Sequence, residues 1–167
     1  SKNLTDHGTI VIDTAGPTST ITAMKYTDSI SNQIDDPADD GSLTIAGPGI
    51  IEITGTAFNE IAANGTDVKA SLDWSKFVWD LDANDTNAGV TFAVGDITSA
   101  VVTSNTLVTV TLSTAKTTSL EATAGFAADG IGATNTADQI VVSTGFTNDP
   151  AGNASTTDAA TVAPTYQ

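Results

Sequence analysis

The chain has 167 residues, no cysteine, and 20 acidic residues against five lysines, which gives a net charge of −15. The length suits one domain with a substantial core, because a chain of this size buries about 70% of its unfolded surface. The negative charge argues against nucleic acid and anionic membrane surfaces as partners, and the lack of cysteine excludes disulfides and thiolate chemistry.

Short runs of β-branched and apolar residues recur between clusters of Asp, Asn and Gly, a pattern that favours half-buried strands. Their number is typical of a β-sandwich. Aromatic residues make up only 5% of the chain, which predicts a core built mainly of Val, Ile, Leu and Ala. In chain order the expected strands are 9–12, 20–26, 49–56, 67–74, 77–81, 90–94, 97–103, 106–112 and 139–143.

The alternation of apolar residues changes phase near residue 75. The run that ends at Trp74 places its apolar residues on even positions, whereas the run that begins at Phe77 uses odd positions. Side chains of a strand alternate with a period of two, so the change needs an inserted residue. We expect a bulge or a short turn at residues 75–76, capped by Asp73.

One segment, residues 113–122, has the pattern of a helix and reads STAKTTSLEA. Ser113 or Thr114 is the expected N-cap, and Gly125 stands just beyond the end. Because threonine is a poor helix former, we expect one to three turns at an edge or end of the sheet.

The two ends of the chain carry similar short motifs. DTAGPTST begins at residue 13 and TVAPTYQ at residue 161, and in each a proline, Pro17 or Pro164, precedes a threonine. Such joints at both ends are typical of one unit of a tandem array. We therefore expect an N-terminal linker or joining strand over 1–17, a β-sandwich over 18–157 and a C-terminal linker over 158–167.

Five stretches carry a resemblance to a known family: VIDTAGPT, IIEITGTAF, SLDWSKFVWDLDAND, ITSAVVTSNTLVTVTLSTA and DPAGNAS, in this order. Together they resemble the immunoglobulin-like repeats of giant bacterial surface proteins, including calcium-dependent biofilm adhesins and S-layer-associated proteins. The resemblance covers nearly the whole chain. It implies an immunoglobulin-like antiparallel β-sandwich, secreted to the bacterial surface, with calcium at or near the joints. Together with the helical segment 113–122, the expected fold is all-β with one short helix. The acidic insertion over residues 28–42 departs from the resemblance.

The segment TNDPAGNAS, residues 147–155, is the first candidate calcium site. Asp149 and Asn153 offer oxygens around a Pro-Ala-Gly turn, and calcium takes six to eight oxygen ligands. One loop cannot supply them all, so Asp13 of VIDTAG or Asp158 of TTDAA is the expected source of further ligands. The alternative is an ordinary turn, because the same residues are good turn formers.

A second candidate calcium site has the spacing D-x-D-x-N and comprises Asp80, Asp82, Asn84 and Asp85. It resembles the first half of an EF-hand loop, but Asp85 stands where that loop has glycine and Thr91 where it has a bidentate glutamate. A solvated loop is the alternative for this segment. For the four aspartates within residues 35–40, a solvated loop is the favoured interpretation.

Enzymatic function is not expected. His7 is the only histidine and lies in the N-terminal segment, and the chain has no G-x-S-x-G or phosphate-binding loop. Two carboxylates could meet for glycoside hydrolysis, but few aromatic residues are present to stack a sugar.

The sequence thus predicts a non-catalytic, calcium-stabilised structural or adhesive module of a bacterial cell-surface protein, with neighbouring copies of the same module as partners. The alternative is a self-assembling filament, sheath or S-layer subunit, whose N-terminal strand around GTIVID pairs with a neighbour's sheet edge. A third possibility is a domain that binds a cell-surface glycan. The sequence contains no signal peptide and no apolar run long enough to span a bilayer.

Overall fold

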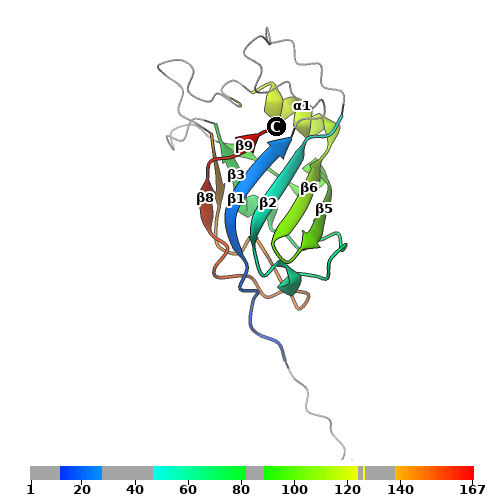
Figure 1. Ribbon diagram of the computed structural model, residues 1–167, viewed down its shortest axis with the longest axis vertical. Coiled ribbons are helices and arrows are strands. Elements are labelled where there is room, and N and C mark those ends of the chain that lie inside the picture. Colours follow the sequence, from blue (N-terminus) through cyan, green and yellow to red (C-terminus); the bar gives the residue numbers. More distant parts are fainter. Residues whose placement is uncertain (1–11, 28–46, 82–88, 124–125, 127–137) are drawn as a thin grey trace, which may run out of the picture.

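The structure is a computed structural model and describes residues 12–27, 47–81, 89–123, 126 and 138–167. These residues form two β-sheets that pack face to face, with one short helix at an end of the sandwich (Figure 1). The expected all-β sandwich is therefore confirmed. Of the expected strand 9–12, only Ile12 is described, and it lies outside any strand.

The first sheet has five strands. Neighbouring strands are antiparallel, except that the short strand at one edge runs parallel to its neighbour. In spatial order the strands are β5 (Ile97–Ser104), β6 (Leu107–Leu112), β2 (Ile50–Thr56), β1 (Thr20–Thr27) and β9 (Thr165–Tyr166).

The second sheet has four antiparallel strands. In spatial order they are β4 (Val90–Thr91), β3 (Phe77–Asp80), β7 (Gln139–Val142) and β8 (Ala160–Val162). Three short 3-10 helices connect strands in the described part of the chain: η1 (Phe58–Glu60), η2 (Trp74–Lys76) and η3 (Val94–Asp96).

Apart from β9, the strand order is that of an immunoglobulin sandwich. In that fold one sheet has the order A-B-E-D and the other contains C, F and G, with an added C′ strand beside C in some members. Here β1, β2, β6 and β5 take the A, B, E and D positions, and β4, β3, β7 and β8 take C′, C, F and G.

The expected strand 67–74 is wrong. The segment makes single β-bridges at Asp67 and Leu72, with turns between them. The Asp67 carboxylate accepts hydrogen bonds from the backbone N–H groups of Lys69 and Ala100, both at 3.0 Å. A short acidic side chain that captures nearby backbone donors competes with the sheet ladder, which explains why alternating residues form a turn here.

The C-terminal segment 158–167 is not a linker in the structure, because it contains β8 and β9. The first of these strands pairs with β7 and the second with β1, so the segment crosses from one sheet to the other. The expected strand 90–94 is likewise shorter than predicted: β4 ends at Thr91 and η3 follows.

The phase change near residue 75 is explained by η2. The Asp73 side chain caps this 3-10 turn, accepting a hydrogen bond of 3.1 Å from the Ser75 N–H. The predicted turn and its cap are therefore confirmed. The turn lets the side chains of Trp74, its first residue, and Phe77, which follows it, both enter the core.

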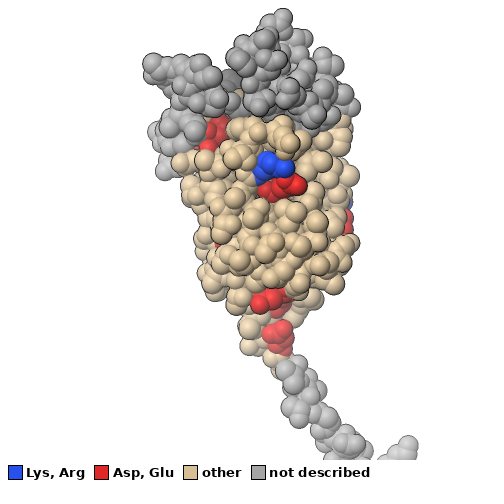
Figure 2. Space-filling model, in the orientation of Figure 1, with Lys and Arg blue, Asp and Glu red and all other residues tan. Residues whose placement is uncertain are grey.

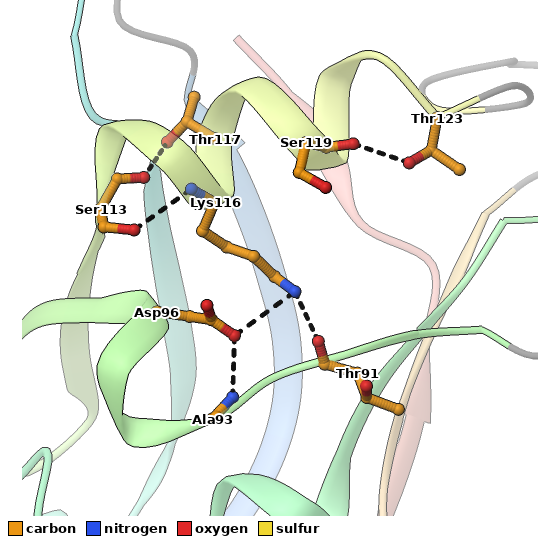
Figure 3. A network of polar contacts seen from close by, with 8 residues as sticks. All are labelled: Thr91, Ala93, Asp96, Ser113, Lys116, Thr117, Ser119 and Thr123. Atoms are coloured by element: carbon orange, nitrogen blue, oxygen red, sulfur yellow. Dashed lines mark hydrogen bonds and ion pairs between the residues drawn. The ribbon is translucent and has the colours of Figure 1, made fainter.

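The helix α1 (Thr114–Glu121) begins at the predicted N-cap, where Ser113 accepts a hydrogen bond of 3.1 Å from the Lys116 N–H. The Lys116 ammonium then ties the helix to the sandwich (Figure 3). It donates to the Thr91 carbonyl at 2.5 Å and lies 3.5 Å from the Asp96 carboxylate. This network holds a helix of weak intrinsic propensity at the end of the sheet.

The core is largely aliphatic, as expected, but most of the few aromatic side chains are also buried in it. They form two clusters of edge-to-face and tilted rings, a geometry that adds to the gain from burial. One cluster consists of Trp74, Phe77, Phe92 and Phe146, and the other of Tyr26, Trp79, Phe126 and Tyr166. Trp79, on the C-type strand β3, is fully buried.

The two ends of the described chain lie at opposite ends of the sandwich (Figure 1). The segment of residues 12–19, hereafter the leading segment, runs to the end away from α1. The strand β9 and the C-terminal Gln167 lie beside α1.

Candidate functional site

The loop of residues 147–155 is a small hairpin closed by its own polar groups. Pro150 follows Asp149 in a β-turn, in which the Gly152 N–H donates to the Asp149 carbonyl at 3.0 Å. Gly152 has φ 86°, a left-handed conformation that favours glycine. The Asp149 carboxylate closes the turn, accepting 2.8 Å hydrogen bonds from both the N–H and the side-chain amide of Asn153.

The leading segment packs against this loop. The Asn153 amide also donates to the Asp13 carbonyl at 3.2 Å, so the two motifs selected from sequence meet in space. The Glu60 carboxylate, from η1, accepts hydrogen bonds from the N–H and hydroxyl of Thr18 at 2.6 Å and 3.0 Å. These contacts fix the path by which the chain reaches β1.

Gly16 allows the closest approach between the leading segment and the loop. A Cβ atom at this position would lie 1.9 Å from the Ala154 carbonyl oxygen. We therefore expect Gly16→Ala to displace the leading segment and to lower the free energy of unfolding by about 1–3 kcal/mol, as overpacking does. Chemical denaturation measures the loss, and faster proteolysis within residues 12–19 locates it.

Gly95 supplies the matched control, because a Cβ there would meet nothing within 4 Å. Gly95→Ala should change stability by less than about 0.5 kcal/mol, as expected at an open surface position. Equal effects of the two variants would show that the Gly16 contact does not hold the leading segment.

A cleft of about 410 Å³ lies between the leading segment and the loop. Three carboxylates from three separate parts of the chain line it, and its described lining contains no lysine or histidine. The lining residues are Asp13, Ala15, Gly16, Pro17, Thr18, Glu60, Asp149 and Pro150. The cleft is therefore negative and rich in oxygen atoms, and we call it the joint cleft.

The hydrogen bond from the Asn153 side chain is the largest cause that holds the pKa of Asp149 below its ordinary value. Partial burial acts in the opposite direction, and the N–H groups of Asn153, Ala151 and Gly152 lower the pKa further. Asp149 is consequently ionised throughout the neutral range.

This lowered pKa predicts how stability depends on pH. The contribution of the ionised carboxylate is complete above the unfolded-state pKa of about 3.9 and is lost as the pH falls through the lower folded-state pKa. The wild type should therefore be more stable than Asp149→Asn at neutral pH, and the difference should shrink in acid. Thermal melts of both proteins from neutral to acidic pH check this, and a constant difference would contradict it.

Asp158, the other expected source of ligands, does not line the joint cleft. Its carboxylate is fully buried and accepts hydrogen bonds from the N–H groups of Gly145 and Thr147, at 2.9 Å and 2.6 Å, and from the Thr147 hydroxyl at 2.9 Å. The same hydroxyl lies 2.6 Å from that of Ser19. Asp158 thus supports the base of the loop from inside.

The second candidate calcium site lies away from the joint cleft. Asp80 is buried at the end of β3, in the ladder position opposite Gln139. Its predicted partners Asp82, Asn84 and Asp85 lie outside the described residues, as do the four aspartates of residues 35–40.

The joint cleft has the oxygen chemistry that calcium requires, but its carboxylates do not form a complete site. Nowhere in the described ranges are three acidic or histidine side chains grouped so as to hold a metal ion. A calcium ion at the cleft would therefore be held by Asp149 or Asp13 together with backbone carbonyls, such as that of Asp13, and water. Bound there, it would neutralise part of the cleft's charge and join the leading segment to the loop.

Glu60 is the cleft residue that sequence reasoning missed. It lies in NEIAAN, which has no repeated acidic spacing, and its partner Thr18 is 42 positions away. The only local signal is the threonine after Pro17, whose N–H and hydroxyl need a partner.

No family model, no curated protein and no solved structure matches this chain. Within the part of the chain that the structure describes, no helix is long and apolar enough to cross a membrane.

Proposed function

We propose that the chain is a non-catalytic structural or adhesive module of a secreted bacterial surface protein, stabilised by calcium at the joint cleft. The observation that carries the proposal is the position of its ends, at opposite ends of the sandwich (Figure 1). Modules of this shape joined in series form an extended rod, in which each contacts only its neighbours.

The docking of the leading segment supports the same function. Hydrogen bonds of Asp13, Thr18 and Ser19, together with the close approach of Gly16, set the direction in which the segment leaves the sandwich. A spacer needs such a fixed direction, because a free linker would let successive modules fold back on one another.

A thermal melt in EDTA and in about 5 mM CaCl₂ tests the calcium proposal. Extracellular calcium modules bind at about 10⁻⁴–10⁻³ M, so binding should add about 1–2 kcal/mol of stability. For a chain of this length the expected rise in Tm is about 3–8 °C. Magnesium at the same concentration should give a smaller rise, because it demands a more rigid octahedral geometry.

Two variants locate the ion. Asp149→Ala should abolish the calcium-dependent rise, whereas Asp96→Asn, which changes an acid paired with Lys116 outside the cleft, should keep it. If the wild type shows no rise with calcium, the ion is not part of the fold.

The assembling subunit remains a second candidate because two features of the described chain suit strand exchange. Ile12 is 76% exposed in an extended segment, and β1 pairs with β9 only at Lys25 and Tyr26. The rest of that β1 edge could accept a strand from a neighbour. Deletion of residues 1–14 should then abolish filaments or sheets seen by electron microscopy, and unchanged assemblies would reject this candidate.

A further inference from the structure

The outer face of the five-stranded sheet is almost free of charge, although the chain carries −15. The five strands contain only two charged residues, Lys25 and Glu52. They lie opposite each other on β1 and β2 and form an ion pair of 2.5 Å. Figure 2 shows one lysine beside one acidic group on a broad uncharged surface, with further acidic groups toward the lower end and another at the upper left.

Threonines make up much of the remaining outward surface of this face, and four of them bond in pairs across the strands. The hydroxyls of Thr20 and Thr56 lie 2.8 Å apart, and those of Thr103 and Thr109 lie 2.9 Å apart. Groups that already have a partner lose less when water is removed from them. We call the outward side chains of these five strands the neutral face.

We propose that the neutral face is the contact between two copies of this chain, packed side by side. Two strongly negative molecules can approach most readily through surfaces without net charge. The joint cleft, with Asp13, Glu60 and Asp149, lies outside this face. The neutral face carries one lysine, Lys25, and one acidic residue, Glu52, so its net charge is zero.

The ion pair makes the neutral face complementary to itself. In a symmetric dimer the same patch serves both copies. A two-fold axis that runs along the strands, between β1 and β2, places Lys25 of each copy against Glu52 of the other. The four charges then alternate in sign, and the two sandwiches point in the same direction.

The contact area sets the strength of this association. The axis superposes β9, β1, β2 and β6 of one copy on β6, β2, β1 and β9 of the other. β9 has two residues and the other three strands have six to eight, which at a strand spacing of about 4.8 Å gives about 350 Å² per copy. About 700 Å² in total is the size of a weak, transient interface. In the proposed rods of many modules, parallel contacts of this kind would add through effective concentration, a consequence that rests on the proposed function.

Sedimentation equilibrium of the full chain tests the contact by exchanging its charges. Wild type should show a reversible monomer–dimer equilibrium at submillimolar to millimolar concentration. Lys25→Glu and Glu52→Lys, each alone, should dimerise at least about tenfold more weakly, because like charges then face each other. An equimolar mixture of the two variants should form a heterodimer, since one face carries two acids and the other two lysines.

The mixture tests the contact between copies independently of the ion pair within one chain. Neither variant retains the Lys25–Glu52 pair, so a heterodimer can gain only from charges on different chains. Both variants should stay folded in circular dichroism, since exposed ion pairs contribute little stability. Thr161→Glu, on the exposed side of the other sheet, should dimerise like wild type. A monomeric wild type, or a mixture no stronger than its components, would overturn the proposal. Repeating the series in EDTA and in calcium distinguishes its failure from failure of the calcium site.

Discussion

Asp158→Ala should lower the free energy of unfolding by about 3–5 kcal/mol, because three buried hydrogen bonds lose their acceptor. The Asp158 carboxylate is completely buried and accepts three hydrogen bonds from Gly145 and Thr147. Its loss leaves two backbone N–H groups without their acceptor, at about 1–3 kcal/mol each. Urea denaturation in EDTA measures the effect without any contribution from calcium.

Two further variants separate the hydrogen bonds from the charge. Asp158→Asn keeps the shape and one accepting oxygen but turns an amide donor toward the others, so a smaller loss of about 1–3 kcal/mol is expected. Asp13→Asn, at an exposed carboxylate at the same end of the sandwich, should change stability by less than about 1 kcal/mol. Similar losses for Asp158→Ala and Asp13→Asn would contradict the structural role of Asp158.

Trp79→Ala should cost about 3–5 kcal/mol, as truncation of a large buried side chain does. Trp79 is fully buried on β3, and its ring centroid lies 5.4 Å from those of both Tyr26 and Phe126. Its indole N–H also donates to the Asp138 carboxylate at 2.9 Å. The substitution therefore removes a ring that joins both sheets and leaves a cavity between them.

Trp79→Phe and Val94→Ala are the matched comparisons. The phenylalanine keeps a ring but loses the indole hydrogen bond, so an intermediate loss of about 1–3 kcal/mol is expected. Val94 is 52% exposed, and its truncation should cost less than about 0.5 kcal/mol. If denaturation followed by circular dichroism gave Trp79→Ala and Val94→Ala the same midpoint, the aromatic cluster would not be central to stability.

Most of the sandwich could be predicted because its strands have a clear alternation and its turns have specific residues. In β6, Val108, Val110 and Leu112 are buried and the residues between them are partly exposed, as a period of two requires. The caps at Asp73 and Ser113 were also predictable, since an oxygen one residue before a turn or helix accepts from its free N–H groups.

The errors occurred where contacts distant in sequence replaced the local pattern. Asp67 bonds to Ala100, 33 positions away, and turns an alternating run out of the sheet. The strands β8 and β9 have weak patterns of their own and form because β7 and β1 offer them open edges. Neither the Asp67–Ala100 bond nor the open strand edges can be recognised in a short stretch of sequence.

The candidate site likewise has some features that the sequence predicts and others that only tertiary packing decides. Turn-forming residues and oxygen ligands at Asp149 and Asn153 were visible in the sequence, because a turn is made by neighbours. The roles of Asp149 and Asp158 could not be distinguished there, since both are aspartates in polar loops near the C-terminus. Their surroundings distinguish them: packing encloses Asp158 among donors inside the sandwich, whereas Asp149 lines the joint cleft.

Composition and short-range patterns were thus sufficient for the all-β class, most strand positions and the helix cap. Each depends on steric and hydrogen-bonding preferences of adjacent residues. Three features depend on tertiary packing: the gathering of the aromatic rings, the meeting of Asp13 with Asn153 across 140 positions, and the separation of the neutral face from the acidic end. The free energy of such contacts exists only after distant segments have been brought together, so no local stretch of sequence records it.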